Sequence, residues 1–89
     1  MPKQDLTLIN KLGLHARASA KMTQTAAAFP CEVWLHARGK RVNGKSIMGV
    51  MMLAAGINTP ISVETIGERE DEALVAICAL INDYFGEGQ

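Results

Sequence analysis

The chain has 89 residues, 48% of them hydrophobic but only four aromatic, and its nine acidic residues balance its nine lysines and arginines. A chain of this length builds one small core, here an aliphatic one, so we expect a single domain over residues 1–89. No apolar run approaches the ~20 residues of a membrane span, and the N-terminus does not resemble a signal peptide. These features argue against membrane insertion and export, and they predict a cytoplasmic protein.

Strands and a helix alternate along the first half of the chain. Residues 5–10 alternate in polarity, which predicts a strand. Strong helix formers run from Ala16 to about Ala28, and Pro30 ends this helix because it disfavours a helical residue before it. The stripe of this helix that faces the core is expected to contain Leu14, Ala18, Met22, Thr25 and Phe29. Residues 31–37 and 41–43 flank an Arg-Gly-Lys turn and predict a β-hairpin.

The second half adds a helix, a strand and a further helix. Ser46 is placed to cap a short helix that Gly56 ends, and residues 61–67 alternate as a strand. Residues 68–88 predict a last helix, whose acidic start suits the helix dipole. Its buried stripe is expected to contain Leu74, Ile77, Ile81 and Phe85. The order β-α-β-β-α-β-α favours an α+β fold, an open-faced two-layer sandwich with helices on one face of an antiparallel sheet.

His15 follows a glycine turn and stands at or next to the N-cap of the first predicted helix. The backbone N–H groups of Ala16, Arg17 and Ala18 have no partner within the helix and form an anion site at that end. The positive end of the helix dipole disfavours an imidazolium, so we expect a neutral, nucleophilic ring. A nucleophilic histidine over an anion site is what phosphoryl transfer through phosphohistidine requires, although a histidine with this spacing alone is more often a surface residue.

The helix after Ser46 has almost no polar face. Only one face of the sheet is available to cover it, so we expect part of its apolar surface to stay exposed and to suit docking of differently shaped partners. The residues that we assign to partner docking are Ile47, Met48, Met51 and Met52, with Lys21 and Lys45 among the cations at the rim.

The cysteines do not indicate a metal or redox site. Cys31 and Cys78 form no CxxC pair, and no further ligands cluster near them or near His36. We therefore expect no metal and no cofactor. Two reduced cysteines are the simplest interpretation, and a single disulfide is the alternative.

Two motifs carry a resemblance to a known family. The segments "GLHARASAKM" (13–22) and "NGKSIMGVMML" (43–53) resemble the active-site signature and the regulatory serine site of the HPr family. These proteins are the small phosphocarriers of the bacterial phosphoenolpyruvate:sugar phosphotransferase system. The resemblance covers essentially the whole chain and implies a four-stranded antiparallel sheet covered on one face by three helices. One position departs from it: the family usually has proline where this chain has Ala18, which adds a backbone donor and predicts altered transfer rates rather than lost function.

The resemblance also implies roles and partners. His15 would accept a phosphoryl group, as pros-phosphohistidine, from phosphorylated enzyme I and donate it to an enzyme IIA protein, and Arg17 would pair with the phosphoryl oxygens. Ser46 would be a regulatory site for an ATP-dependent HPr kinase/phosphorylase. The chain would be a relay component rather than a stand-alone enzyme, and a monomer, since it must expose one face to successive partners.

Two other functions are alternatives at this point. A regulatory module of the same family, of a nitrogen-type branch or under HPr kinase control, would act by binding partners, with phosphoryl flux secondary. A nucleic-acid binder would use residues 1–45, which hold eight of the nine cations. The chain lacks the interleaved aromatic and basic residues of an RNA-binding sheet, so we expect no nucleic-acid partner.

Overall fold

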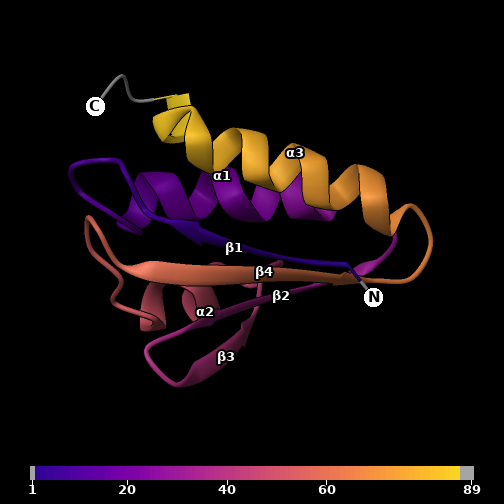
Figure 1. Ribbon diagram of the computed structural model, residues 1–89, viewed down its shortest axis with the longest axis horizontal. Coiled ribbons are helices and arrows are strands. Elements are labelled where there is room, and N and C mark those ends of the chain that lie inside the picture. Colours follow the sequence, from indigo (N-terminus) through magenta and orange to yellow (C-terminus); the bar gives the residue numbers. More distant parts are fainter. Residues whose placement is uncertain (1, 87–89) are drawn as a thin grey trace.

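The computed structural model describes residues 2–86, which fold around one four-stranded antiparallel sheet. The strands are β1 (Lys3–Thr7), β2 (Glu32–Ala37), β3 (Lys40–Asn43) and β4 (Pro60–Ile66), in the spatial order β1-β4-β2-β3. The helices are α1 (Ala16–Ala27), α2 (Ile47–Met52) and α3 (Glu70–Asn82), followed by the 3₁₀ turn η1 (Tyr84–Gly86). The predicted element order and the α+β sandwich are confirmed (Figure 1).

The helices cover one face of the sheet and leave the other open. Figure 1 shows α1 and α3 side by side along the sheet, and α2 contacts both α1 and β3. Burial alternates along the strands, because successive side chains point to opposite faces. The buried strand residues include Val33, Leu35 and Ala37 of β2 and Ile61, Val63 and Thr65 of β4, as the sequence predicts.

The buried stripe of α1 differs from the predicted one at its C-terminal end. Ala18 and Met22 are fully buried, as expected, but Ala26 takes the next buried position. Thr25 and Phe29 are only partly buried. The helix itself spans Ala16–Ala27, in agreement with the prediction.

The predicted ends of two elements in the first two-thirds of the chain are wrong. The first strand covers Lys3–Thr7 rather than residues 5–10, because the Leu8 backbone already bonds to the loop at Thr59. The short helix α2 ends at Met52 instead of continuing to Gly56. The chain leaves this helix through Ala54, whose φ of +50° lies in the left-handed region. The left-handed residue that follows this helix is therefore Ala54, and not the predicted Gly56.

Ala54 predicts a stabilising substitution. The left-handed conformation costs a non-glycine residue about 1–2 kcal/mol, whereas glycine adds about 0.4–1 kcal/mol of conformational entropy to the unfolded chain. Ala54→Gly is therefore expected to raise the free energy of unfolding by about 0.5–1 kcal/mol, measured by urea denaturation. The matched control is Ala28→Gly, because Ala28 is also exposed at a helix end but has φ −71°. It should lose stability, and a gain in both variants would contradict the argument.

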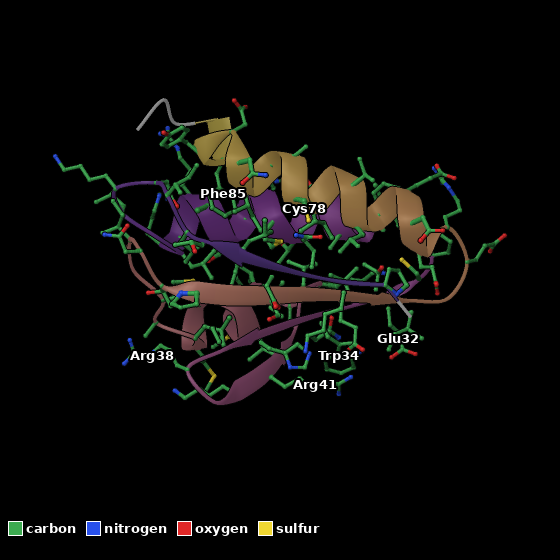
Figure 2. The ribbon with its side chains drawn as sticks, viewed as in Figure 1. Glu32, Trp34, Arg38, Arg41, Cys78 and Phe85 are labelled. Carbon is green, nitrogen blue, oxygen red and sulfur yellow. The ribbon has the colours of Figure 1, made fainter. Side chains whose placement is uncertain are left out.

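The predicted last helix is too long. α3 ends at Asn82, and the next residues turn back through three successive positive φ angles, at Tyr84, Phe85 and Gly86. Phe85 is fully buried, but it enters the core from η1 rather than from the helix stripe (Figure 2). Lys21 of α1 holds this turn, since its Nζ donates to the Phe85 carbonyl at 2.6 Å. Residues 87 and 88 of the predicted helix lie outside the described residues.

The acidic start of α3 is confirmed, with Glu70, Asp71 and Glu72 in its first turn. Arg69 precedes them, and its Nη2 lies 2.9 Å from Glu72 Oε2. This hydrogen-bonded ion pair raises the pKa of Arg69 and lowers the pKa of Glu72. Both side chains are exposed to solvent, so this ion pair contributes little to stability, and we do not assign it to a functional site.

Candidate functional site

His15 occupies the N-cap of α1, as predicted. Its backbone is extended and its carbonyl accepts the first helical hydrogen bond, from Ser19 N at 2.8 Å. Its ring Nδ1 accepts a hydrogen bond from Arg17 N at 3.3 Å. A nitrogen that accepts in this way carries a lone pair, which assigns the proton of the neutral ring to Nε2. The ring of the half-buried His15 therefore directs its unprotonated nitrogen, Nδ1, at the N-terminus of α1.

The loop before His15 is fixed on both sides. Leu14 N donates to Ala55 O at 2.9 Å, which ties the loop to the segment after α2. The Asn10 side chain donates from Nδ2 to Gly13 O at 2.8 Å. Gly13 has φ +64°, and a Cβ there would lie 2.6 Å from Gly56 Cα and closer still to Ala55 O. Only glycine allows this approach between the two loops, and the approach sets where His15 starts the helix.

The structure brings together the three backbone donors that the sequence predicts. Ala16, Arg17 and Ala18 all precede Ser19, whose N–H is the first with a partner one helical turn back. These N–H groups lie at the positive end of the α1 dipole beside His15 Nδ1, an arrangement that favours an anion. The Arg17 side chain is exposed, so its guanidinium is free to reach a group bound there.

Ser46 caps α2, as predicted, because its Oγ accepts from Gly49 N at 3.1 Å. The hydroxyl is exposed and lies at the N-terminal end of α2. The other end of α2 leads to Ala55, which binds the loop before His15. The two candidate sites therefore lie at opposite ends of one short helix.

The predicted exposure of the α2 surface is confirmed. Val50 is fully buried, whereas Ile47, Met48, Met51 and Met52 are 42% to 71% exposed. Sequence reasoning missed two further members, Leu12 and Ile57, which are 66% and 48% exposed. They stand in the two loops that touch at Gly13. We call these six residues the apolar patch.

The exposure of Leu12 and Ile57 could have been predicted from their positions in the sequence. Leu12 and Ile57 are large aliphatic residues that each stand next to a turn glycine, outside the helices and strands. Such a residue has no regular element to bury it. Exposed apolar residues gathered beside a site are typical of interaction surfaces.

The two lysines assigned to docking are engaged at some distance from His15. Lys21 Nζ donates to the Phe85 carbonyl at 2.6 Å and Lys45 Nζ donates to the Phe29 carbonyl at 2.7 Å. Phe29 follows the C-terminal end of α1, whereas His15 caps its N-terminal end. A lysine at a helix C-terminus compensates the negative end of the dipole, so Lys45 contributes to the stability of α1.

Within residues 2–86 no three His, Cys, Asp or Glu side chains are grouped to hold a metal ion. Cys31 and Cys78 are both free thiols, and partial burial raises the pKa of the Cys78 thiol. None of the helices among these residues is long and apolar enough to cross a membrane.

Comparison with known proteins agrees with this geometry. Residues 2–83 match the family model described as PTS HPr component phosphorylation site. The chain is 61% identical to phosphocarrier protein HPr of Neisseria meningitidis serogroup A and 56% identical to that of Cupriavidus necator, in each case over 100% of both chains. A crystal structure of an HPr from Thermoanaerobacter tengcongensis matches with a TM-score of 0.94 at 39% identity, over 98% of each chain. The family that the motifs predict is thereby confirmed, and the chain belongs to the HPr family of the phosphotransferase system.

Proposed function

We propose that this chain is a phosphocarrier that accepts a phosphoryl group on His15 Nδ1 from phosphorylated enzyme I and donates it to an enzyme IIA protein. The observation that carries the proposal is the hydrogen bond of 3.3 Å from Arg17 N to His15 Nδ1 at the start of α1. A phosphoryl group on this nitrogen would lie among the N–H donors of the helix end, which favour an anion. Membership of the HPr family supports the choice of partners.

The transfer step uses the lone pair of Nδ1. This pair attacks phosphorus, the bond from phosphorus to the donor atom breaks, and its electrons return to the donor. Nε2 keeps its proton, the backbone N–H groups and the Arg17 guanidinium hold the phosphoryl oxygens, and the same step in reverse passes the group to the next partner. Since His15 is restored after each cycle, the chain acts as a relay component rather than a stand-alone enzyme.

The apolar patch supplies the docking surface in this proposal. Partners of different shape would pack on its flexible methionine side chains. Lys21 and Lys45 are not part of this surface in the proposal, because their amino groups bind the carbonyls of Phe85 and Phe29. Each partner occupies the same face in turn, so the working form is a monomer acting as one HPr-like domain over residues 1–89. Its place of action is the cytoplasm, where the phosphoenolpyruvate-derived group would be supplied.

The direct test is phosphoryl transfer from labelled phosphoenolpyruvate in the presence of enzyme I. The expected product is an acid-labile adduct of one phosphoryl group per chain, with nitrogen–phosphorus coupling that assigns it to Nδ1. Label that is acid-stable, or attached to Nε2, would overturn the mechanism.

Ala18 predicts a change in the lifetime of the phosphorylated form. Ala18→Pro removes one N–H donor from the anion site, while the ring of proline fits the first turn of a helix. Loss of one charge-assisted hydrogen bond is expected to shorten the half-life of phospho-His15 by roughly threefold to tenfold. The control is Ala18→Gly, which keeps the donor. Equal half-lives in the proline variant and the wild type would show that this N–H group does not hold the phosphoryl group.

We further propose that Ser46 is a regulatory phosphorylation site, a substrate for an HPr kinase/phosphorylase. The supporting observation is an exposed hydroxyl at the end of α2, beside Ile47 and Met48 of the apolar patch. A phosphate there suits its own helix but places negative charge beside the docking surface.

Ser46→Asp is the test of this second proposal. Aspartate caps a helix about as well as serine, so the fold is retained while a charge is added. Phosphoryl acceptance from enzyme I is expected to slow by roughly threefold to tenfold, as an increase in KM. Ser46→Asn is the matched control, because asparagine caps without a charge. Acceptance by the aspartate variant at the wild-type rate would refute the proposal.

The alternative is a regulatory module whose output is partner binding rather than phosphoryl flux. A signalling role that survives in a His15→Ala strain would favour it. The fixed geometry of Nδ1 over the anion site favours transfer.

A further inference from the structure

The open face of the sheet, which the proposed function does not use, carries a hollow of about 620 Å³. All four strands and the β2–β3 turn line it. The strand register places four of its side chains in one row across the sheet. Asp5 of β1 pairs with Ser62 of β4, Ser62 pairs with His36 of β2, and His36 pairs with Arg41 of β3. Directly paired residues project from the same face, so these polar groups share one surface.

Contacts with neighbouring side chains hold the members of this row in place. Ser62 Oγ donates to Asp5 Oδ1 at 2.6 Å. Glu64 Oε1 lies 3.3 Å from His36 Nε2 and 4.0 Å from Arg41 Nη2. The Arg41 guanidinium also stacks on Trp34, at 3.8 Å from the ring centroid (Figure 2). Polar groups that are oriented before a ligand arrives bind it with a smaller entropic cost.

The two ends of the row have opposite charge. Arg41 lies at the β3 end and Asp5 at the β1 end, whereas the neighbouring Lys40 projects to the helix side, where its Nζ lies 3.5 Å from Met52 O. With strands about 4.8 Å apart, the row spans roughly 14 Å, the reach of a small elongated molecule. An anionic group fits the cationic end. The carboxylate of Asp5, with acceptor positions left after the bond from Ser62, fits hydroxyl donors.

We propose that this hollow binds a small phosphorylated polyol or sugar, with the phosphate at Arg41 and the hydroxyl groups at Asp5 and Ser62. The row favours a ligand with both features. A second anionic group would meet the carboxylate of Asp5, and an uncharged polyol would leave the Arg41 guanidinium without a bound anion. The inference is independent of the proposed function, because the hollow lies on the face away from the helices and does not include His15.

Titration with glucose 6-phosphate, followed by backbone amide NMR shifts, tests the site. The largest shifts are expected in residues 5–6, 36–41 and 60–62, and the fluorescence of Trp34, the only tryptophan, should change with them. Glucose has only the hydroxyl groups and inorganic phosphate only the anionic group, so each should bind at least about tenfold more weakly than glucose 6-phosphate. Shifts centred on residues 15–18 would assign the binding to the anion site of α1 and overturn the proposal, as would equal affinity for all three probes.

Variants complete the test. Arg41→Gln is expected to weaken glucose 6-phosphate binding about tenfold, because it removes a charge-assisted contact. Arg69→Gln is the matched control, since Arg69 is also an exposed arginine next to an aromatic ring, Phe29, but at the start of α3. It should leave binding unchanged, and so should His15→Ala. Unaltered binding in Arg41→Gln, with thermal unfolding showing a folded protein, would exclude the site.

Discussion

Replacement of His15 by alanine is expected to abolish phosphoryl acceptance from phosphorylated enzyme I while the protein stays folded. The substitution removes Nδ1, the nitrogen that we propose as the phosphoryl acceptor. It also removes an N-cap side chain, which costs about 1 kcal/mol of stability, too little to unfold a domain of this kind. Label incorporation from phosphoenolpyruvate measures the first effect, and thermal unfolding measures the second.

The second histidine provides the matched control. His36 lies on the open face of β2, where its Nε2 is 3.3 Å from Glu64 Oε1. A His36→Ala variant should accept phosphoryl groups at the wild-type level. Acid-labile label on the His15→Ala protein, or its loss from the His36→Ala protein, would place the acceptor elsewhere.

Replacement of Gly13 by alanine is expected to cause the largest loss of stability among these variants, about 3 kcal/mol. The new Cβ would meet backbone atoms of Ala55 and Gly56, which have no side-chain rotation to relieve the contact. The left-handed φ of +64° adds strain, and separation of the loops breaks the bond from Leu14 N to Ala55 O. Because this loop sets the N-cap, the rate of phosphoryl transfer should fall as well.

A substitution at Gly39 measures the backbone strain of a left-handed residue without a steric clash. Its φ is +77°, but a Cβ there would meet nothing within 4 Å. Gly39→Ala should therefore cost only the strain of the left-handed conformation, about 1–2 kcal/mol, in the same urea measurement. Similar losses in the two variants would show that the contact with Ala55 and Gly56 is not what makes Gly13 necessary.

The sequence predicts those parts of the molecule that depend on local chemistry. The alternation around Val33 and Leu35, the helix formers after His15 and the capping position of Ser46 each depend on neighbours within a few residues. The position of His15 at the N-cap of α1 could be recognised for the same reason. The exposure of the α2 methionines could be predicted because the helix is apolar on nearly all sides and only one face of the sheet is available to cover it.

Other features depend on residues far apart in the chain. Positions 84 and 85 adopt left-handed φ angles, but neither is the glycine that would indicate such a turn in the sequence. Burial of Phe85 and the hydrogen bond from Lys21 stabilise this turn. The carbonyl groups that bind Lys21 and Lys45 belong to other elements. The row from Asp5 to Arg41 arises from the register of four strands, which no single strand specifies.

The short helix α2 has a consequence for the lifetime of complexes. It has six residues and buries only Val50 within its length, so its stability depends on packing against α1 rather than on its own helix propensity. We expect a partner that docks on the apolar patch to immobilise its exposed methionine side chains, and this loss of side-chain entropy reduces the net affinity. Weaker complexes dissociate faster. For a relay, rapid departure is as necessary as recognition, and α2 would supply both.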